Sequence, residues 1–148
     1  MPSEISAGSD HPVVVDASVW ISAVLEQDRF HAISRPWLDR QRRPTFGVML
    51  PALALAEIGG AIGRISDDPV RAQAVVRHVQ RLRAVHIHAL DLDLAVAATN
   101  LAIDLRLRGA DAVYVALAAR LAVPLVTWDQ ELLERAAGRI EVRMPEGE

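Results

Sequence analysis

The sequence predicts a single three-layer α/β domain, in which helices flank both faces of a parallel β-sheet. Short apolar runs of strand length alternate with segments of helix length along the whole chain, which is typical of this fold class. Hydrophobic residues make up 51% of the composition and aromatic residues only 4%, so Ala, Leu, Val and Ile must form the core, as in helix-covered parallel sheets. A chain of 148 residues suits one domain and is short for two.

The boundaries of the elements follow from capping and turn residues. We expect strands at 13–15, 45–50, 85–90, 124–127 and 140–142. We expect helices at 17–25, 30–40, 52–64, 70–84, 111–121 and 130–136, and one that runs from Asp91 or Asp93 to 107. Asp68 is expected to cap a helix that has Pro69 at its first position, Pro51 to open the preceding helix, and Gly109 to end the helix before 111. The domain should span 13–143, between a flexible leader at 1–12 and a frayed tail at 144–148.

The composition excludes several kinds of site. The chain has no cysteine, which removes disulfides, thiolate zinc sites and a cysteine nucleophile. It also has no lysine, because all 16 basic residues are arginine, and this removes a P-loop lysine and Schiff-base chemistry. The segment 46–63 is apolar but carries Glu57 and falls short of the ~20 residues that a membrane span needs. We therefore expect a cytoplasmic protein without a membrane segment.

Four acidic residues stand within apolar stretches far apart in the sequence. Asp16, Asp111 and Asp129 lie where a strand or helix begins, and Glu57 lies inside an apolar helix. Taken singly, each has an ordinary explanation, a helix N-cap for the three Asp and a surface position for Glu57. Taken together, they favour a joint site, because a parallel sheet brings such positions to one rim.

Carboxylates gathered at one rim repel each other and raise their pKa values. Divalent cations with oxygen ligands relieve this repulsion, and Mg²⁺ or Mn²⁺ is the natural choice. The net charge of −3 is not that of an obvious nucleic-acid-binding protein, but bound cations would offset part of it locally. Helix N-termini around the same pocket would also favour a phosphate-containing substrate.

Four motifs resemble those of the PIN-domain family, and within it the VapC-type toxins of bacterial toxin–antitoxin pairs. They are VVVDASV at 13–19, the segment around Glu57, LRGADAVYVALA at 107–118 and VTWDQEL at 126–132. The resemblance covers roughly 13–143. It departs from the family pattern only in a long leader and in Trp128, which stands beside the fourth acid.

The resemblance implies a Mg²⁺- or Mn²⁺-dependent endoribonuclease that hydrolyses RNA phosphodiester bonds and acts as a toxin. Asp16, Glu57 and Asp111 would be the main metal ligands, with Asp129 bound directly or through water. Ser18 and Thr127 would be supporting hydroxyls. The implied partners are RNA, a second copy in a homodimer, and a cognate antitoxin that wraps the groove between the early helices.

Side chains for these contacts can be suggested from the sequence. Trp20, Phe30 and Trp37 are candidates for the groove, although Trp37 fits an ordinary core position better. The arginines that could contact RNA are Arg35, Arg40, Arg42, Arg43, Arg106 and Arg108. For the dimer interface, we suggest the surroundings of Gly59 and Gly60 or the helix at 70–82.

Other functions were weighed against this one. A response-regulator receiver or a haloacid-dehalogenase-like phosphatase needs a lysine, and the latter also needs an Asp where this chain has Ser18. Two alternatives stay open: a PIN nuclease of housekeeping RNA processing, and a PIN-fold binding module that no longer cleaves.

Overall fold

The protein is described by a computed structural model that covers residues 11–146. The elements in chain order are β1 (Val13–Val15), α1 (Ala17–Val24), α2 (His31–Gln41), β2 (Val48–Pro51), α3 (Leu53–Ser66), α4 (Pro69–Arg81), β3 (Val85–His88), α5 (Leu92–Leu105), α6 (Gly109–Leu121), β4 (Leu125–Val126), α7 (Gln130–Arg135) and β5 (Val142–Arg143). Most of the predicted leader and the last two residues of the predicted tail lie outside the described residues.

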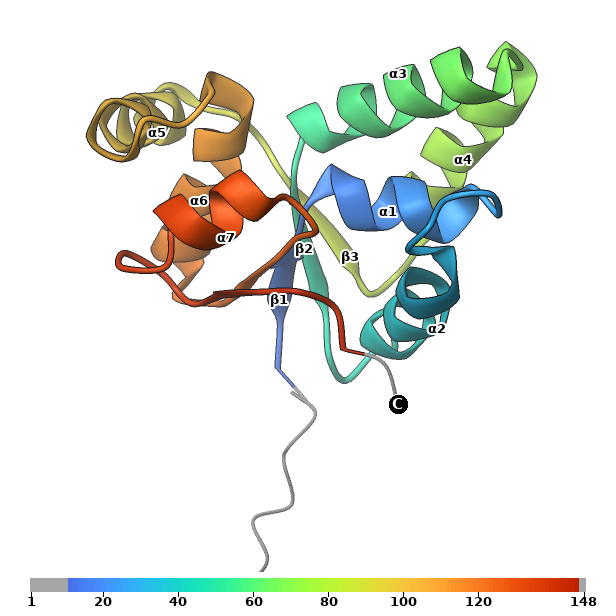
Figure 1. Cartoon of the computed structure of the whole chain (residues 1–148), viewed down its shortest axis with the longest axis horizontal. Coiled ribbons are helices and arrows are strands. Elements are labelled where there is room, and N and C mark those ends of the chain that lie inside the picture. The colour runs from blue at the N-terminus through green and yellow to red at the C-terminus, as the bar shows by residue number, and fades with distance from the viewer. Residues whose placement is uncertain (1–10, 147–148) are drawn as a thin grey trace, which may run out of the picture.

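The predicted α/β fold is confirmed. The five strands form one sheet of order β3-β2-β1-β4-β5, and every neighbouring pair is parallel. The chain moves from β1 outward to β3, crosses back to β4 beside β1, and continues to β5. Helices α1 to α4 therefore cover one face of the sheet and α5 to α7 the other (Figure 1). The reversal at β1 and β4 creates the crevice at which open parallel sheets bind ligands.

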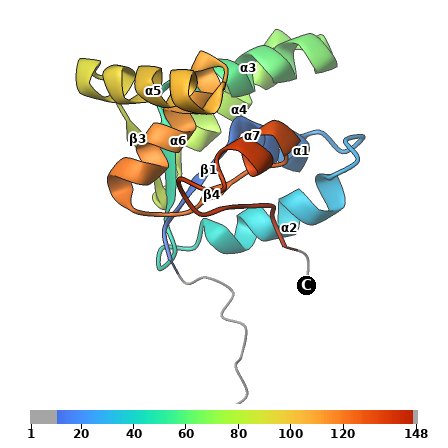
Figure 2. The ribbon, with the colours of Figure 1, turned by 60° about the vertical axis from the view of Figure 1, so that its left-hand side comes forward.

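Helix α6 is the central element of the core. It packs on β1, β2 and β4, and α5 packs mainly on α6 rather than on the sheet (Figure 2). The run 112–118 of α6 is buried throughout, as is all of β1. Elements buried on all sides read as continuous apolar runs in the sequence, which is why VVV and AVYVALA stand out there.

The helix boundaries expected at a proline and at a glycine are wrong. Pro51 does not open a helix but ends β2, and α3 begins at Leu53. Gly109 does not end α5; it is the first residue of α6, and α5 ends at Leu105, followed by Arg106 in the left-handed conformation at φ 55°. The Arg135 guanidinium donates a hydrogen bond to the Arg106 carbonyl. Capping rules consider only residues near the helix end, so they could not predict this contact.

Two other capping predictions are confirmed. The Asp68 side chain accepts a hydrogen bond from the Arg71 amide at the start of α4, and Asp91 accepts one from the Leu94 amide at the start of α5.

Gly59 of α3 lies close to α4. A Cβ on Gly59 would lie 3.0 Å from a methyl of Val76, which is tighter than most such contacts, so the Val76 side chain would have to shift by a few tenths of an ångström. The missing side chain of Gly59 therefore allows α3 to lie close to α4 within the chain, and the dimer interface suggested around Gly59 and Gly60 stays a prediction.

Candidate active site

Asp16 lies directly after β1, at the carboxyl end of the central strand. The residue occupies the N-cap position of α1, but its side chain makes no capping hydrogen bond. Instead its Oδ2 accepts hydrogen bonds from the Ser18 hydroxyl at 2.7 Å and the Thr127 hydroxyl at 2.8 Å. The residue is only 6% exposed. The ordinary capping explanation is therefore wrong for Asp16, whose carboxylate is held in place from two elements.

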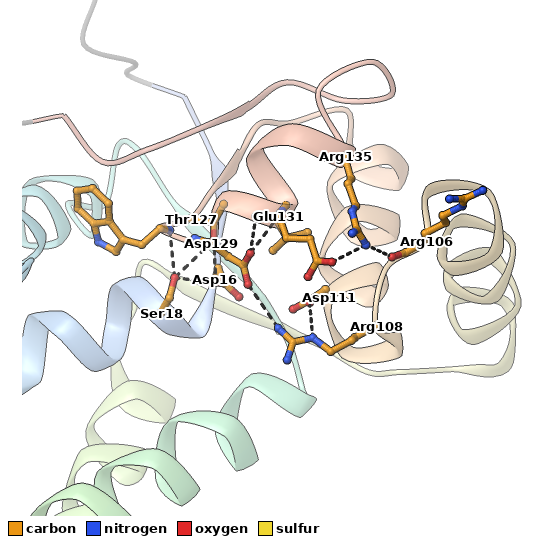
Figure 3. A network of polar contacts seen from close by, with 11 residues as sticks. Asp16, Ser18, Arg106, Arg108, Asp111, Thr127, Asp129, Glu131 and Arg135 are labelled. Carbon is orange, nitrogen blue, oxygen red and sulfur yellow. Dashed lines mark hydrogen bonds and ion pairs between the residues drawn. The ribbon is translucent and has the colours of Figure 1, made fainter.

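Asp129 begins α7 and belongs to the same network. One of its oxygens, Oδ1, caps α7 by accepting from the amides of Glu131 and Leu132. The capping explanation is thus correct for Asp129, but capping uses only this oxygen. Its backbone amide donates to the Thr127 hydroxyl at 3.0 Å, which ties Asp129 to the group that holds Asp16 (Figure 3).

Asp111 lies in the first turn of α6, whose N-cap residue is Arg108 and not Asp111 as the sequence suggested. The Arg108 guanidinium lies between two acids, with Nε 3.4 Å from Asp111 Oδ2 and Nη2 3.7 Å from Asp129 Oδ2 (Figure 3). Its side chain is 75% exposed, so these ion pairs are weak and readily exchanged for other partners.

Glu57 lies in α3. Its Oε1 accepts a hydrogen bond of 2.7 Å from the hydroxyl of Tyr114, a fully buried residue of α6. Sequence reasoning missed Tyr114, although a signal existed: it is the one tyrosine of the chain and lies in an otherwise aliphatic run three residues after Asp111.

One open cleft of about 430 Å³ joins these residues. All four predicted acids and Ser18 line it, together with Arg64 and Arg108. The buried Thr127 lies behind Asp16 and contacts it through its hydroxyl. The structure thus brings together the six predicted site residues from four separate segments of the chain.

The electrostatics of the cleft are those of crowded carboxylates. Burial raises the pKa of Asp16, Glu57 and Asp111 above the ordinary values of 3.8, 4.5 and 3.8. Repulsion adds to this effect, because Asp129 raises the pKa values of Asp16 and Asp111. The hydroxyls of Ser18 and Thr127 lower the pKa of Asp16, and Tyr114 lowers that of Glu57, since each donates to the ionised form.

The carboxylates do not yet form a closed metal cage. Within residues 11–146, no group of three or more His, Cys, Asp or Glu side chains is arranged to hold a metal ion. The cleft is wide, and the Arg108 guanidinium partly fills the space between Asp111 and Asp129.

The other predicted contact residues are distributed differently. Arg35 and Arg42 pair with Asp39, which neutralises part of the proposed arginine patch on α2. Of the three aromatic residues suggested for a groove, Trp20 lines one, whereas Trp37 packs against the core and Phe30 stacks on Trp128.

Replacing Tyr114 with phenylalanine is expected to raise the pKa of Glu57 further, because the variant removes the hydrogen bond that favours the ionised carboxylate. An NMR titration that follows the Glu57 carboxyl carbon measures this directly. The buried ring remains, so the fold should survive. A Glu57 titration unchanged by the substitution would contradict the role given to Tyr114.

The PIN-domain family model matches residues 13–138. The chain belongs to the PIN-domain family. Similar solved structures include the sarcin-ricin-loop-cleaving toxin VapC20 of Mycobacterium tuberculosis, at 18% identity, TM-score 0.70, with 86% of this chain and 95% of that chain covered. A second is VapBC2 of Rickettsia felis bound to a promoter DNA fragment, at 11% identity and TM-score 0.69, covering 91% and 99%. A third is FitAcB of Neisseria gonorrhoeae, at 17% identity and TM-score 0.67, covering 90% and 97%.

These neighbours confirm the PIN fold over most of the chain and include structures of VapC toxins and toxin–antitoxin complexes. No curated protein matches the sequence significantly. None of the helices within residues 11–146 is long and apolar enough to cross a membrane.

Proposed function

We propose that this PIN domain is a metal-dependent endoribonuclease and the toxin of a toxin–antitoxin pair. The observation that carries the proposal is the convergence of Asp16, Glu57, Asp111 and Asp129 on one cleft at the carboxyl ends of the strands. A fold has no structural need for four carboxylates there, since burial and mutual repulsion make their ionised forms unfavourable.

The donor set fits a hard divalent cation such as Mg²⁺ or Mn²⁺. All candidate ligands are oxygens, and neither a thiol nor an imidazole lines the cleft. Asp16, Glu57 and Asp111 would hold the ion, with Asp129 bound directly or through water. Among residues 11–146 these side chains do not form a closed cage, so a bound cation would compete with the Arg108 guanidinium for Asp111 and Asp129.

When bound, a divalent cation lowers the pKa of an attacking water and stabilises a leaving oxygen. The protein orients the carboxylates that would bind the cation. Ser18 and Thr127 both donate hydrogen bonds to Oδ2 of Asp16 and orient its carboxylate, and Tyr114 orients that of Glu57. Arg64 and Arg108 line the same cleft and offer cations to the phosphates of RNA. The Arg108 side chain is 75% exposed and could exchange its ion pairs for contacts with the substrate backbone.

The antitoxin is proposed to occupy a groove of about 410 Å³ between α1, α2 and α4. Its wall is apolar, with Ala23, Leu38, Val75 and Val79, and its rim carries charged residues of both signs. The buried indole nitrogen of Trp20, which also lines the groove, has no hydrogen-bond partner among the described residues. Several structural neighbours are toxin–antitoxin complexes, which supports a protein segment as the occupant.

The homodimer implied by the family resemblance stays a prediction. Leu92, Val96 and Ile103 form an exposed apolar stripe on α5 that offers a surface for it.

Two alternatives differ in measurable ways. A housekeeping nuclease would cleave RNA but would not arrest growth when expressed without a partner, whereas a toxin would. A non-cleaving binding module would bind RNA or protein equally well in the presence of a chelator.

The direct test is incubation of the purified, antitoxin-free protein with a panel of structured RNAs in Mg²⁺ or Mn²⁺. We expect discrete fragments, which are lost with EDTA and with Asp111→Asn. Cleavage that survives both treatments would contradict the metal-dependent site. Uncut RNA across the panel, from folded protein that binds Mn²⁺, would favour the binding module.

A further inference from the structure

The loop between β4 and α7 carries two of the site residues, Thr127 and Asp129. Thr127 holds Asp16, and Asp129 lines the cleft. The flanking elements are short, because β4 has 2 residues and α7 has 6. The Thr127 amide donates to the Arg143 carbonyl at 3.0 Å, and side-chain contacts from elsewhere in the fold add to this backbone bond.

Trp128, the residue between them, provides such contacts through its side chain. The indole ring stacks on Phe30 with centroids 4.0 Å apart and planes 5° from parallel. The indole N–H donates to the hydroxyl of Ser34 at 2.8 Å. Ser34 is fully buried in α2, and its hydroxyl is 2.7 Å from that of Ser22 in α1. The indole is therefore fixed both by its face and by its one polar atom.

The backbone of Trp128 continues this connection to the acids. Its amide donates to the Ser18 hydroxyl at 3.2 Å, and that hydroxyl donates to Asp16. Trp128 itself does not line the cleft. The contacts thus run from α2 and the residue before it, through a side chain outside the cleft, to the groups that orient Asp16 and Asp129.

We propose that Trp128 is a positioning residue, clamped by Phe30 and Ser34, that holds the 127–129 loop so that Thr127 and Asp129 face Asp16. As far as it concerns metal binding, this inference rests on the proposed function. Residues that orient metal ligands typically change metal affinity by about 10- to 100-fold when they are replaced. Metal affinity should therefore depend on a tryptophan that touches no metal.

The test compares Trp128→Leu, Ser34→Ala and the conservative Trp128→Phe with wild type. Mn²⁺ affinity is measured by calorimetry, and hydrogen exchange of the amides at 127–132 by mass spectrometry. Trp128→Leu should weaken Mn²⁺ binding about 10-fold or more and speed exchange of these amides. Trp128→Phe keeps a ring on Phe30 and should recover part of both losses. Ser34→Ala should have a smaller effect, and adding it to Trp128→Leu should cost nothing further, because Ser34 acts through the indole.

Trp37→Leu is the matched control, since Trp37 is half-buried against the core and outside the cleft. It should change neither Mn²⁺ affinity nor loop exchange. The positioning role is overturned if Trp128→Leu and Ser34→Ala leave both unchanged, or if Trp37→Leu has the same effect. Wild-type protein that binds no Mn²⁺ would defeat the proposed function instead. In that case, hydrogen exchange of the amides at 127–132 alone would decide the role of Trp128. An exchange rate unchanged in Trp128→Leu would overturn that role.

Discussion

Asp16→Asn is expected to abolish RNA cleavage, by at least about 10³-fold, which corresponds to about 4 kcal/mol in the activation barrier. Asparagine keeps the shape of the side chain and an oxygen for the Ser18 and Thr127 hydroxyls, but it removes the charge that a divalent cation requires. Single-turnover cleavage of an RNA identified as a substrate measures the loss.

The control is Asp104→Asn, which removes a carboxylate from an exposed ion pair outside the cleft. It should cleave like wild type. Because burial raises the pKa of Asp16, the ionised group is unfavourable in the metal-free fold, and Asp16→Asn should unfold at the same or a higher temperature. A variant that is inactive because it unfolds, or one that retains most of its activity, would contradict the role of Asp16.

The second expected result concerns the free energy of unfolding. It should fall as the pH rises in the metal-free protein, and Mn²⁺ should offset this fall. The folded-state pKa values of Asp16, Glu57 and Asp111 lie above their ordinary values of 3.8, 4.5 and 3.8. A carboxyl with a raised pKa contributes stability below its unfolded pKa, and this contribution is lost as the pH rises through the folded value. The metal-free protein should therefore lose stability relative to Asp16→Asn as the pH rises from about 4 toward neutral.

Mn²⁺ should cancel this loss. At about 100 times its dissociation constant, a ligand of the native state adds about 2.7 kcal/mol to the free energy of unfolding. For a chain of this size, that corresponds to a rise in Tm of about 5–10 °C. The rise should be larger at pH 7.5 than at pH 5, since protons compete for the same oxygens. Thermal unfolding monitored by circular dichroism measures the rise in Tm caused by Mn²⁺ and its dependence on pH. An equal rise in wild type and Asp16→Asn would contradict Mn²⁺ binding at Asp16.

The fold could be predicted from the sequence because its determining features are local or periodic. The buried strand at Val13–Val15, the caps Asp68 and Asp91, and the alternation of strands and helices all leave direct traces in the chain. The boundaries at Pro51 and Gly109 could not be predicted. At Pro51, pairing with His88 of β3 overrode the preference of proline for a first helical position, whereas the helix before Gly109 had already ended at Arg106 in the left-handed conformation.

The candidate site was predicted as a set of residues, and the structure brings that set together in one cleft and directly behind it. What could not be predicted is how the acids are held. The hydrogen bond from Tyr114 to Glu57 joins residues 57 positions apart, and the bond from Trp128 to Ser34 joins residues 94 apart. Such contacts cannot be predicted from the sequence separation of the two residues or from their types, since a buried tyrosine or tryptophan is equally compatible with ordinary core packing.

The proposed activity requires four carboxylates that act jointly on a divalent cation. The most direct test is anomalous diffraction from a crystal of the antitoxin-free protein soaked in Mn²⁺. We predict an anomalous peak in the cleft bounded by Asp16, Glu57, Asp111 and Asp129, with the Arg108 side chain displaced from its two acids. A well-ordered cleft without a peak at saturating Mn²⁺, or a peak elsewhere on the protein, would contradict the account.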